Sequence, residues 1–96
     1  MYDAAAVAKE FVPENKPRLL KLREALEKLE PFDHEVVGAT LAGVAKELGV
    51  KTGVLVHPTR VACCGNTSGP SLYHLMAIIG KAKVLTRLDE ALAKIG

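Results

Sequence analysis

The sequence lacks the long apolar runs and leader patterns that would direct it to a membrane. No run approaches the roughly 18 apolar residues that a membrane span needs. The opening MYDAAAVAKE has no basic stretch followed by an apolar block, as a secretory signal would. We therefore expect a soluble, cytoplasmic protein without membrane contact.

Cysteine is scarce, because the chain holds only the adjacent pair Cys63 and Cys64. Two neighbouring thiols cannot build a disulfide framework, and they lack the spacer that lets both sulfurs reach one zinc ion. His57 and His74 would complete a set of four ligands, but this spacing does not favour a metal site. We expect no bound metal and two free thiols in the core.

Catalytic motifs are also missing. The sequence has no phosphate-binding loop of the Walker type, no dinucleotide-binding glycine motif and no spaced carboxylate pair in a catalytic setting. We therefore expect no catalytic residue and no cofactor in this chain.

Acidic residues are absent between Glu47 and Asp89. Residues 1–50 hold seven bases against nine acids, whereas residues 51–96 hold six bases against two acids, so the two parts carry −2 and +4. A phosphate-bearing partner would favour the second part, since each neutralised phosphate releases counterions. An ordinary solvated helical surface is the other interpretation, and the charges alone do not separate the two.

Apolar residues recur at helical spacing along most of the chain, and 96 residues suffice for one domain with one core. We predict an all-α compact bundle of about five to six short helices. The expected helices lie near residues 4–12, 17–30, 34–48, 51–63, 72–79 and 81–95. Their expected buried positions are Ala4, Val7, Ala8 and Phe11; Leu19, Leu22, Leu26 and Leu29; Val37, Leu41, Val44 and Leu48; Leu72, Leu75, Met76 and Ile79; Val84, Leu88, Ala91 or Leu92, and Ile95.

The fourth of these helices is the ambiguous one. Thr52, Val54 and Val56 suit a strand, whereas Thr52 and Gly53 could equally open a helix. No second strand-like run is present to pair with it. We therefore predict a helix that continues, with a kink, past Pro58.

Residues 65–70 form a loop that delivers Ser71, Leu72 and Tyr73 to the next helix. Thr67 and Ser68 supply hydroxyls there, and a helix N-terminus supplies free backbone N–H groups. These hydroxyls and N–H groups, together with the aromatic ring of Tyr73, suit unstacked single-stranded bases, which are bound by hydrogen bonds and by stacking on such a ring. The same residues are also ordinary turn formers.

Three short motifs follow one another in this region: HPTRVA at residues 57–62, GPSLY at residues 69–73 and IGK at residues 79–81. In order and spacing they resemble the C-terminal end of bacterial-type glutamyl-tRNA synthetase, a class I aminoacyl-tRNA synthetase. The similarity covers residues 32–93 well and the first thirty residues loosely.

This resemblance implies an all-helical anticodon-binding subdomain at residues 32–96, preceded by lead-in helices at residues 1–31 that link it to upstream synthetase domains. The implied partner is the anticodon loop of glutamate tRNA, and the implied parent is a monomeric, ATP-dependent glutamate–tRNA ligase. ATP and magnesium would bind a catalytic domain outside this chain. The implied tRNA-binding residues are Arg60, Thr67, Ser68, Gly69, Pro70, Leu72, Tyr73 and Lys81.

Some positions depart from the family pattern. The family usually has a hydrophobic residue in place of Thr59, leucine in place of Cys63 and threonine in place of Cys64. It commonly has a basic residue in place of Asn66 and glycine in place of Ser71. The departures at Cys64 and Asn66 motivate an alternative hypothesis. In it, the chain keeps the fold as a helical protein-interaction or docking module and has lost RNA reading.

Overall fold

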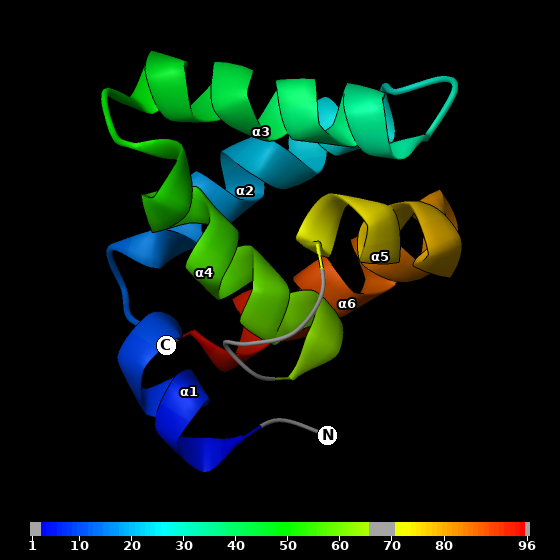
Figure 1. Ribbon diagram of the computed structural model, residues 1–96. Helices are drawn as coiled ribbons and strands as arrows, with labels where there is room; N and C mark the ends of the chain where they lie inside the picture. The colour runs from blue at the N-terminus through cyan, green and yellow to red at the C-terminus, as the bar shows by residue number, and fades with distance from the viewer. Residues whose placement is uncertain (1–2, 66–70, 96) are drawn as a thin grey trace.

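The computed structural model describes residues 3–65 and 71–95, and this part of the chain folds into six helices without a strand (Figure 1). The prediction of an all-α bundle is therefore confirmed. The helices are α1 (Ala4–Glu10), α2 (Asn15–Glu27), α3 (His34–Leu48), α4 (Thr52–Cys64), α5 (Leu72–Ile79) and α6 (Lys81–Lys94). None of the helices in the described part is long and apolar enough to cross a membrane.

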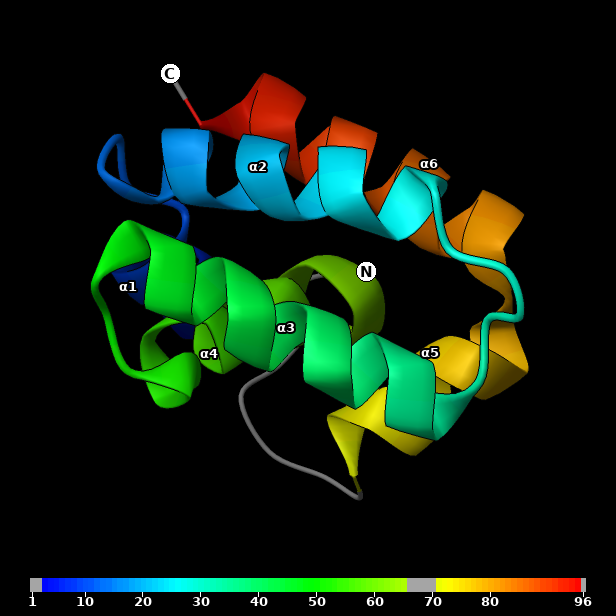
Figure 2. The same cartoon turned by 90° about the horizontal axis from the view of Figure 1, so that it is seen from above.

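Helices α2 and α6 lie side by side, and α3 packs against α2, α4 and α5 (Figure 2). One hydrophobic cluster fills the space between them, and every helix contributes to it. Its largest fully buried apolar side chains are Leu19, Leu22, Leu26, Leu41, Leu55, Met76, Leu88 and Ile95. Because α1 and α2 share this cluster, the first thirty residues are part of the same core. Their predicted role as a link to an upstream domain stays a prediction.

The helix ends follow from local chemistry. Asp33 accepts a hydrogen bond from the backbone N–H of Val36 at 2.9 Å, and Asp3 accepts one from Ala6 at 3.1 Å. Both are N-caps that satisfy a donor left unpaired by the helix. Helix α3 ends at Gly49, whose φ of 71° lies in the left-handed region that favours glycine.

Helix α4 runs through Pro58, as predicted. Thr59, which follows it, is fully buried, and its hydroxyl donates to the carbonyl of Leu55 at 2.7 Å. A buried hydroxyl costs free energy unless it has a partner, and this bond supplies one. The core therefore accommodates the hydroxyl of a threonine at this position.

The predicted buried face of α1 is wrong in part. Ala4 and Ala8 are exposed, whereas Ala6 and Glu10 are buried. The backbone N–H of Asp3 donates to the carbonyl of Gly65 at 2.7 Å, which fixes the start of α1 against the end of α4. This long-range contact sets the rotation of a short helix whose own periodicity is weak.

Candidate nucleic-acid interface

Arg60 lies one turn before the end of α4 and is half-buried. Its Nη1 atom is out of contact with solvent and has no hydrogen-bond partner among the described residues. A buried donor without an acceptor costs about 1–3 kcal/mol, and more when it is charged. The half-buried guanidinium therefore keeps an unpaired donor, and an acceptor can reach Nη1 only when the atoms that cover it move aside.

The end of α4 is held by hydrogen bonds from α6 and from the N-cap of α1. Arg87 of α6 donates from Nη1 to the carbonyl of Cys63 at 2.7 Å, and the Asp3 N–H donates to the carbonyl of Gly65 at 2.7 Å. These bonds satisfy carbonyls that the helix end leaves unpaired. The point from which residues 66–70 leave α4 is thus fixed from two sides.

Four of the predicted tRNA-binding residues, Thr67, Ser68, Gly69 and Pro70, lie outside the described residues. Leu72 is described and is only 3% exposed, because it belongs to the hydrophobic cluster. The structure therefore gives the Leu72 side chain a place in the core, and its contact with RNA stays a prediction.

The ring of Tyr73 packs on the backbone of Gly38 in α3. A Cβ atom at residue 38 would lie 2.9 Å from Cδ2 of Tyr73, closer than real Cβ atoms come to a neighbour, and 3.2 Å from its Cε2, tighter than most such contacts. Glycine is thus the residue that lets the half-buried ring seat against α3. Neither motif nor spacing indicates this contact, because it joins residues far apart in the chain.

Gly38→Ala is expected to lower the free energy of unfolding by about 1–2 kcal/mol, since overpacking costs about 1–3 kcal/mol and alanine returns up to about 1 kcal/mol of helix propensity. Gly43 is the matched control in the same helix, because a Cβ there meets no described atom within 4 Å. Gly43→Ala should raise stability by about 0.5–1 kcal/mol. Urea denaturation of both variants measures the difference, and equal shifts would contradict the close approach.

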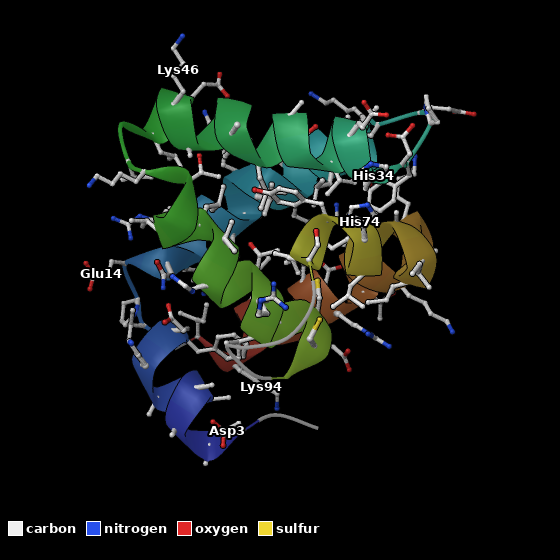
Figure 3. The ribbon with its side chains drawn as sticks, in the orientation of Figure 1. Asp3, Glu14, His34, Lys46, His74 and Lys94 are labelled. Carbon is white, nitrogen blue, oxygen red and sulfur yellow. The ribbon has the colours of Figure 1, made fainter. Side chains whose placement is uncertain are left out.

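His34 and His74 form a second contact between α3 and α5. Their rings stack face to face, with centroids 3.9 Å apart and an interplanar angle of 17° (Figure 3). His74 Nδ1 also lies 3.0 Å from the hydroxyl of Ser71. His34 is exposed in the first turn of α3, and the stack helps to fix the first turn of α5, which carries Tyr73.

Lys81, also a predicted tRNA-binding residue, lies at the start of α6. Its ammonium group donates to the carbonyls of Glu27 at 3.2 Å and Leu29 at 2.9 Å. These are carbonyls at and just beyond the end of α2, where a cation is favourable. The structure therefore gives Lys81 a capping role, and its contact with RNA stays a prediction.

The two cysteines differ in their surroundings. Cys63 is buried, as expected of a core thiol, and burial raises its pKa to about 12, with the neighbouring Cys64 adding to the shift and Arg87 opposing it. Cys64 is only half-buried, and both cysteines border one cavity. No group of three or more His, Cys, Asp or Glu side chains in the described part of the chain could hold a metal ion.

The folded chain is expected to react with a disulfide reagent at one thiol only at pH 8. A thiolate is the reacting species, and the raised pKa of the buried Cys63 keeps that thiol protonated, whereas the half-buried Cys64 is open to the reagent. Thiol titration with 2,2′-dithiodipyridine, before and after adding denaturant, counts the reactive groups. Cys64→Ser should abolish the native reaction and Cys63→Ser should retain it; the opposite pattern would contradict the assignment.

Comparison with known proteins gives consistent matches. A family model described as an anticodon binding domain matches residues 1–92. Glutamate–tRNA ligase of Desulforudis audaxviator is 42% identical over 98 residues, covering 99% of this chain and 20% of that protein. The glutamate–tRNA ligase of Elusimicrobium minutum is 41% identical over 79 residues, covering 82% of this chain and 16% of that protein.

A solved structure of a related protein agrees with these sequence matches. The crystal structure of a glutamate tRNA ligase from Elizabethkingia meningosepticum, in complex with its amino acid, superposes with a TM-score of 0.92 at 27% identity. The match covers 99% of this chain and 19% of that one. The chain thus spans about a fifth of the length of the relatives it matches.

Proposed function

Because the chain belongs to the anticodon-binding domain family, with glutamate–tRNA ligases among its relatives, we propose that it binds the anticodon loop of glutamate tRNA. The observation that carries the proposal is the state of Arg60. Its guanidinium has a buried Nη1 without an acceptor among the described residues, near the end of a helix that α1 and α6 hold in place. RNA phosphates and base edges offer acceptors for such a group.

Charge supports the same partner. Lys51 lies at the N-cap of α4 and Arg60 lies on the helix, within the stretch that has no acid between Glu47 and Asp89. An approaching phosphate therefore meets no carboxylate on that helix. The family assignment favours RNA binding over the docking-module alternative.

The proposal extends to the whole protein of which this domain would be a part. We place the chain in a monomeric, cytoplasmic glutamate–tRNA ligase, in which upstream domains carry out the ATP-dependent attachment of glutamate. ATP and magnesium would bind the catalytic domain, outside these 96 residues.

The direct test is binding of the full chain to an RNA stem–loop carrying the anticodon arm of glutamate tRNA. Fluorescence anisotropy at several salt concentrations should give a dissociation constant that rises with salt, by about 0.7–0.9 logarithmic units per tenfold salt for each phosphate contacted. A stem–loop of the same length with an unrelated anticodon should bind at least tenfold more weakly. Equal affinity for both RNAs would contradict anticodon recognition, and no binding at low salt would contradict the function.

A further inference from the structure

A cavity of about 470 Å³ lies where the end of α4 meets α5 and α6. Leu75 and Ile79 of α5 supply apolar wall, and Arg87 and Glu90 border the cavity from α6. The end of α4 borders it with Ala62, Cys63, Cys64 and Gly65. Among the described residues, none of the predicted tRNA-binding side chains lines it. The cavity therefore lies outside the predicted anticodon contacts, yet it reaches Gly65, the last described residue before the predicted RNA-binding turn.

The charged side of the cavity carries one donor group and one acceptor group. Arg87 is anchored by its bond from Nη1 to the carbonyl of Cys63, so its planar guanidinium has a fixed position. Glu90 follows three residues later, on the same face of α6. Its exposed carboxylate makes no hydrogen bond or ion pair with another described residue. The carboxylate is thus an acceptor without a partner beside a positioned donor.

We propose that this cavity binds one unpaired nucleobase of the bound RNA, a base with an exocyclic amino group such as cytosine or adenine. Its volume lies in the range of small-ligand sites, roughly 300–1,000 Å³, and so holds a base with room to spare. The apolar wall suits the faces of the ring. The carboxylate of Glu90 accepts from the amino group, and the guanidinium of Arg87 donates to the adjacent ring acceptor.

Uracil fits this edge less well, because it presents a carbonyl oxygen where cytosine presents an amino group, and that oxygen would face the carboxylate of Glu90. A protein side chain is the weaker candidate for the occupant, since the fixed guanidinium and free carboxylate together match a planar edge that both donates and accepts. The proposal rests on the RNA binding proposed above and adds a separate subsite to it.

Cys64 provides a test that leaves the sequence unchanged. With 2,2′-dithiodipyridine, the Cys64 sulfur forms a disulfide to one thiopyridine while the second leaves as 2-thiopyridone. This adds a neutral ring at the edge of the cavity. Affinity for the anticodon stem–loop should fall at least fivefold and return when dithiothreitol removes the ring. Bound RNA should in turn slow the modification at least fivefold.

A modified chain that binds the stem–loop as well as the unmodified chain would overturn the proposal, while RNA binding by the unmodified chain would keep the proposed function intact. Failure of the unmodified chain to bind would refute both. Thermal unfolding of the modified chain shows whether the added ring has disturbed the fold. The protection of Cys64 by RNA is measured on the native chain and does not depend on that control.

Glu90→Gln tests the base edge independently. The ratio of affinities for short oligo(C) and oligo(U) is the measured quantity, because loss of one negative charge strengthens the binding of any RNA. The ratio should fall at least threefold in Glu90→Gln. Glu47→Gln removes an exposed acid of α3 with the same change in charge and should leave the ratio unchanged. An unchanged ratio in Glu90→Gln would overturn the assignment of a base to this cavity.

Discussion

Arg60→Ala is expected to weaken binding of the anticodon stem–loop at least tenfold. A hydrogen bond from a charged group contributes about 1.5–3 kcal/mol, and about 1.4 kcal/mol corresponds to tenfold in affinity. Because Arg60 Nη1 has no acceptor among the described residues, its loss should lower the free energy of unfolding by less than about 1 kcal/mol. Binding and stability should therefore respond differently to this one substitution.

Lys46 is the matched control for charge. It lies in the last turn of α3, at the end of the helix away from the His34–His74 stack, and points outward (Figure 3). Lys46→Ala makes the same change in net charge and should alter the affinity less than twofold. Arg60→Ala should also reduce the slope of the logarithm of the dissociation constant against the logarithm of salt concentration, by the contribution of about one phosphate contact. Equal losses in the two variants would show that Arg60 acts only through the net charge of the chain.

Arg60→Lys separates charge from geometry. Lysine keeps the positive charge but lacks the planar set of donors that arginine presents to a base edge or phosphate. We expect its affinity to lie between those of the unmodified chain and Arg60→Ala. Affinity equal to that of the unmodified chain would indicate that Arg60 supplies charge alone.

Leu41→Ala is expected to lower the free energy of unfolding by about 2–5 kcal/mol, because it removes buried methyl groups and leaves a cavity. Leu41 is fully buried in α3, the helix that packs against α2, α4 and α5. For a small domain this is a large part of a total stability of about 5–15 kcal/mol. Urea denaturation measures the change through the midpoint, with a slope that should stay constant.

Leu20 provides the control for this prediction, because it is 48% exposed on α2. Leu20→Ala should change the free energy of unfolding by no more than about 0.5 kcal/mol. A loss in Leu41→Ala as small as that in Leu20→Ala would mean that the centre of the bundle is not packed as described.

The sequence was informative wherever the deciding interactions are local. Asp33 and Gly49 bound α3 through capping and a left-handed residue, and both effects act within a few residues. The leucine stripe of α2 predicted its buried face for Leu19, Leu22 and Leu26. Local spacing therefore determined the type and approximate extent of the helices.

Contacts between distant residues were beyond such inference. The pairing of His34 with His74, the approach of Tyr73 to Gly38 and the capping of α2 by Lys81 each depend on how helices pack. The same holds for the cavity, whose lining comes from three helices. The sequence indicated Arg60 only through a family motif, and its unpaired donor became visible in the fold.

The hydrogen bond from the Asp3 N–H to the carbonyl of Gly65 brings the beginning of the chain next to the departure point of the predicted RNA-binding turn. An amide in such a bond exchanges its proton with solvent only when the bond opens. RNA that steadies the end of α4 should therefore slow deuterium uptake at Asp3, although that residue is remote from the turn in sequence. The Asp3 amide would thus act as a built-in reporter of RNA binding, and removing residues 1–3 would take away one of the two bonds that hold the end of α4.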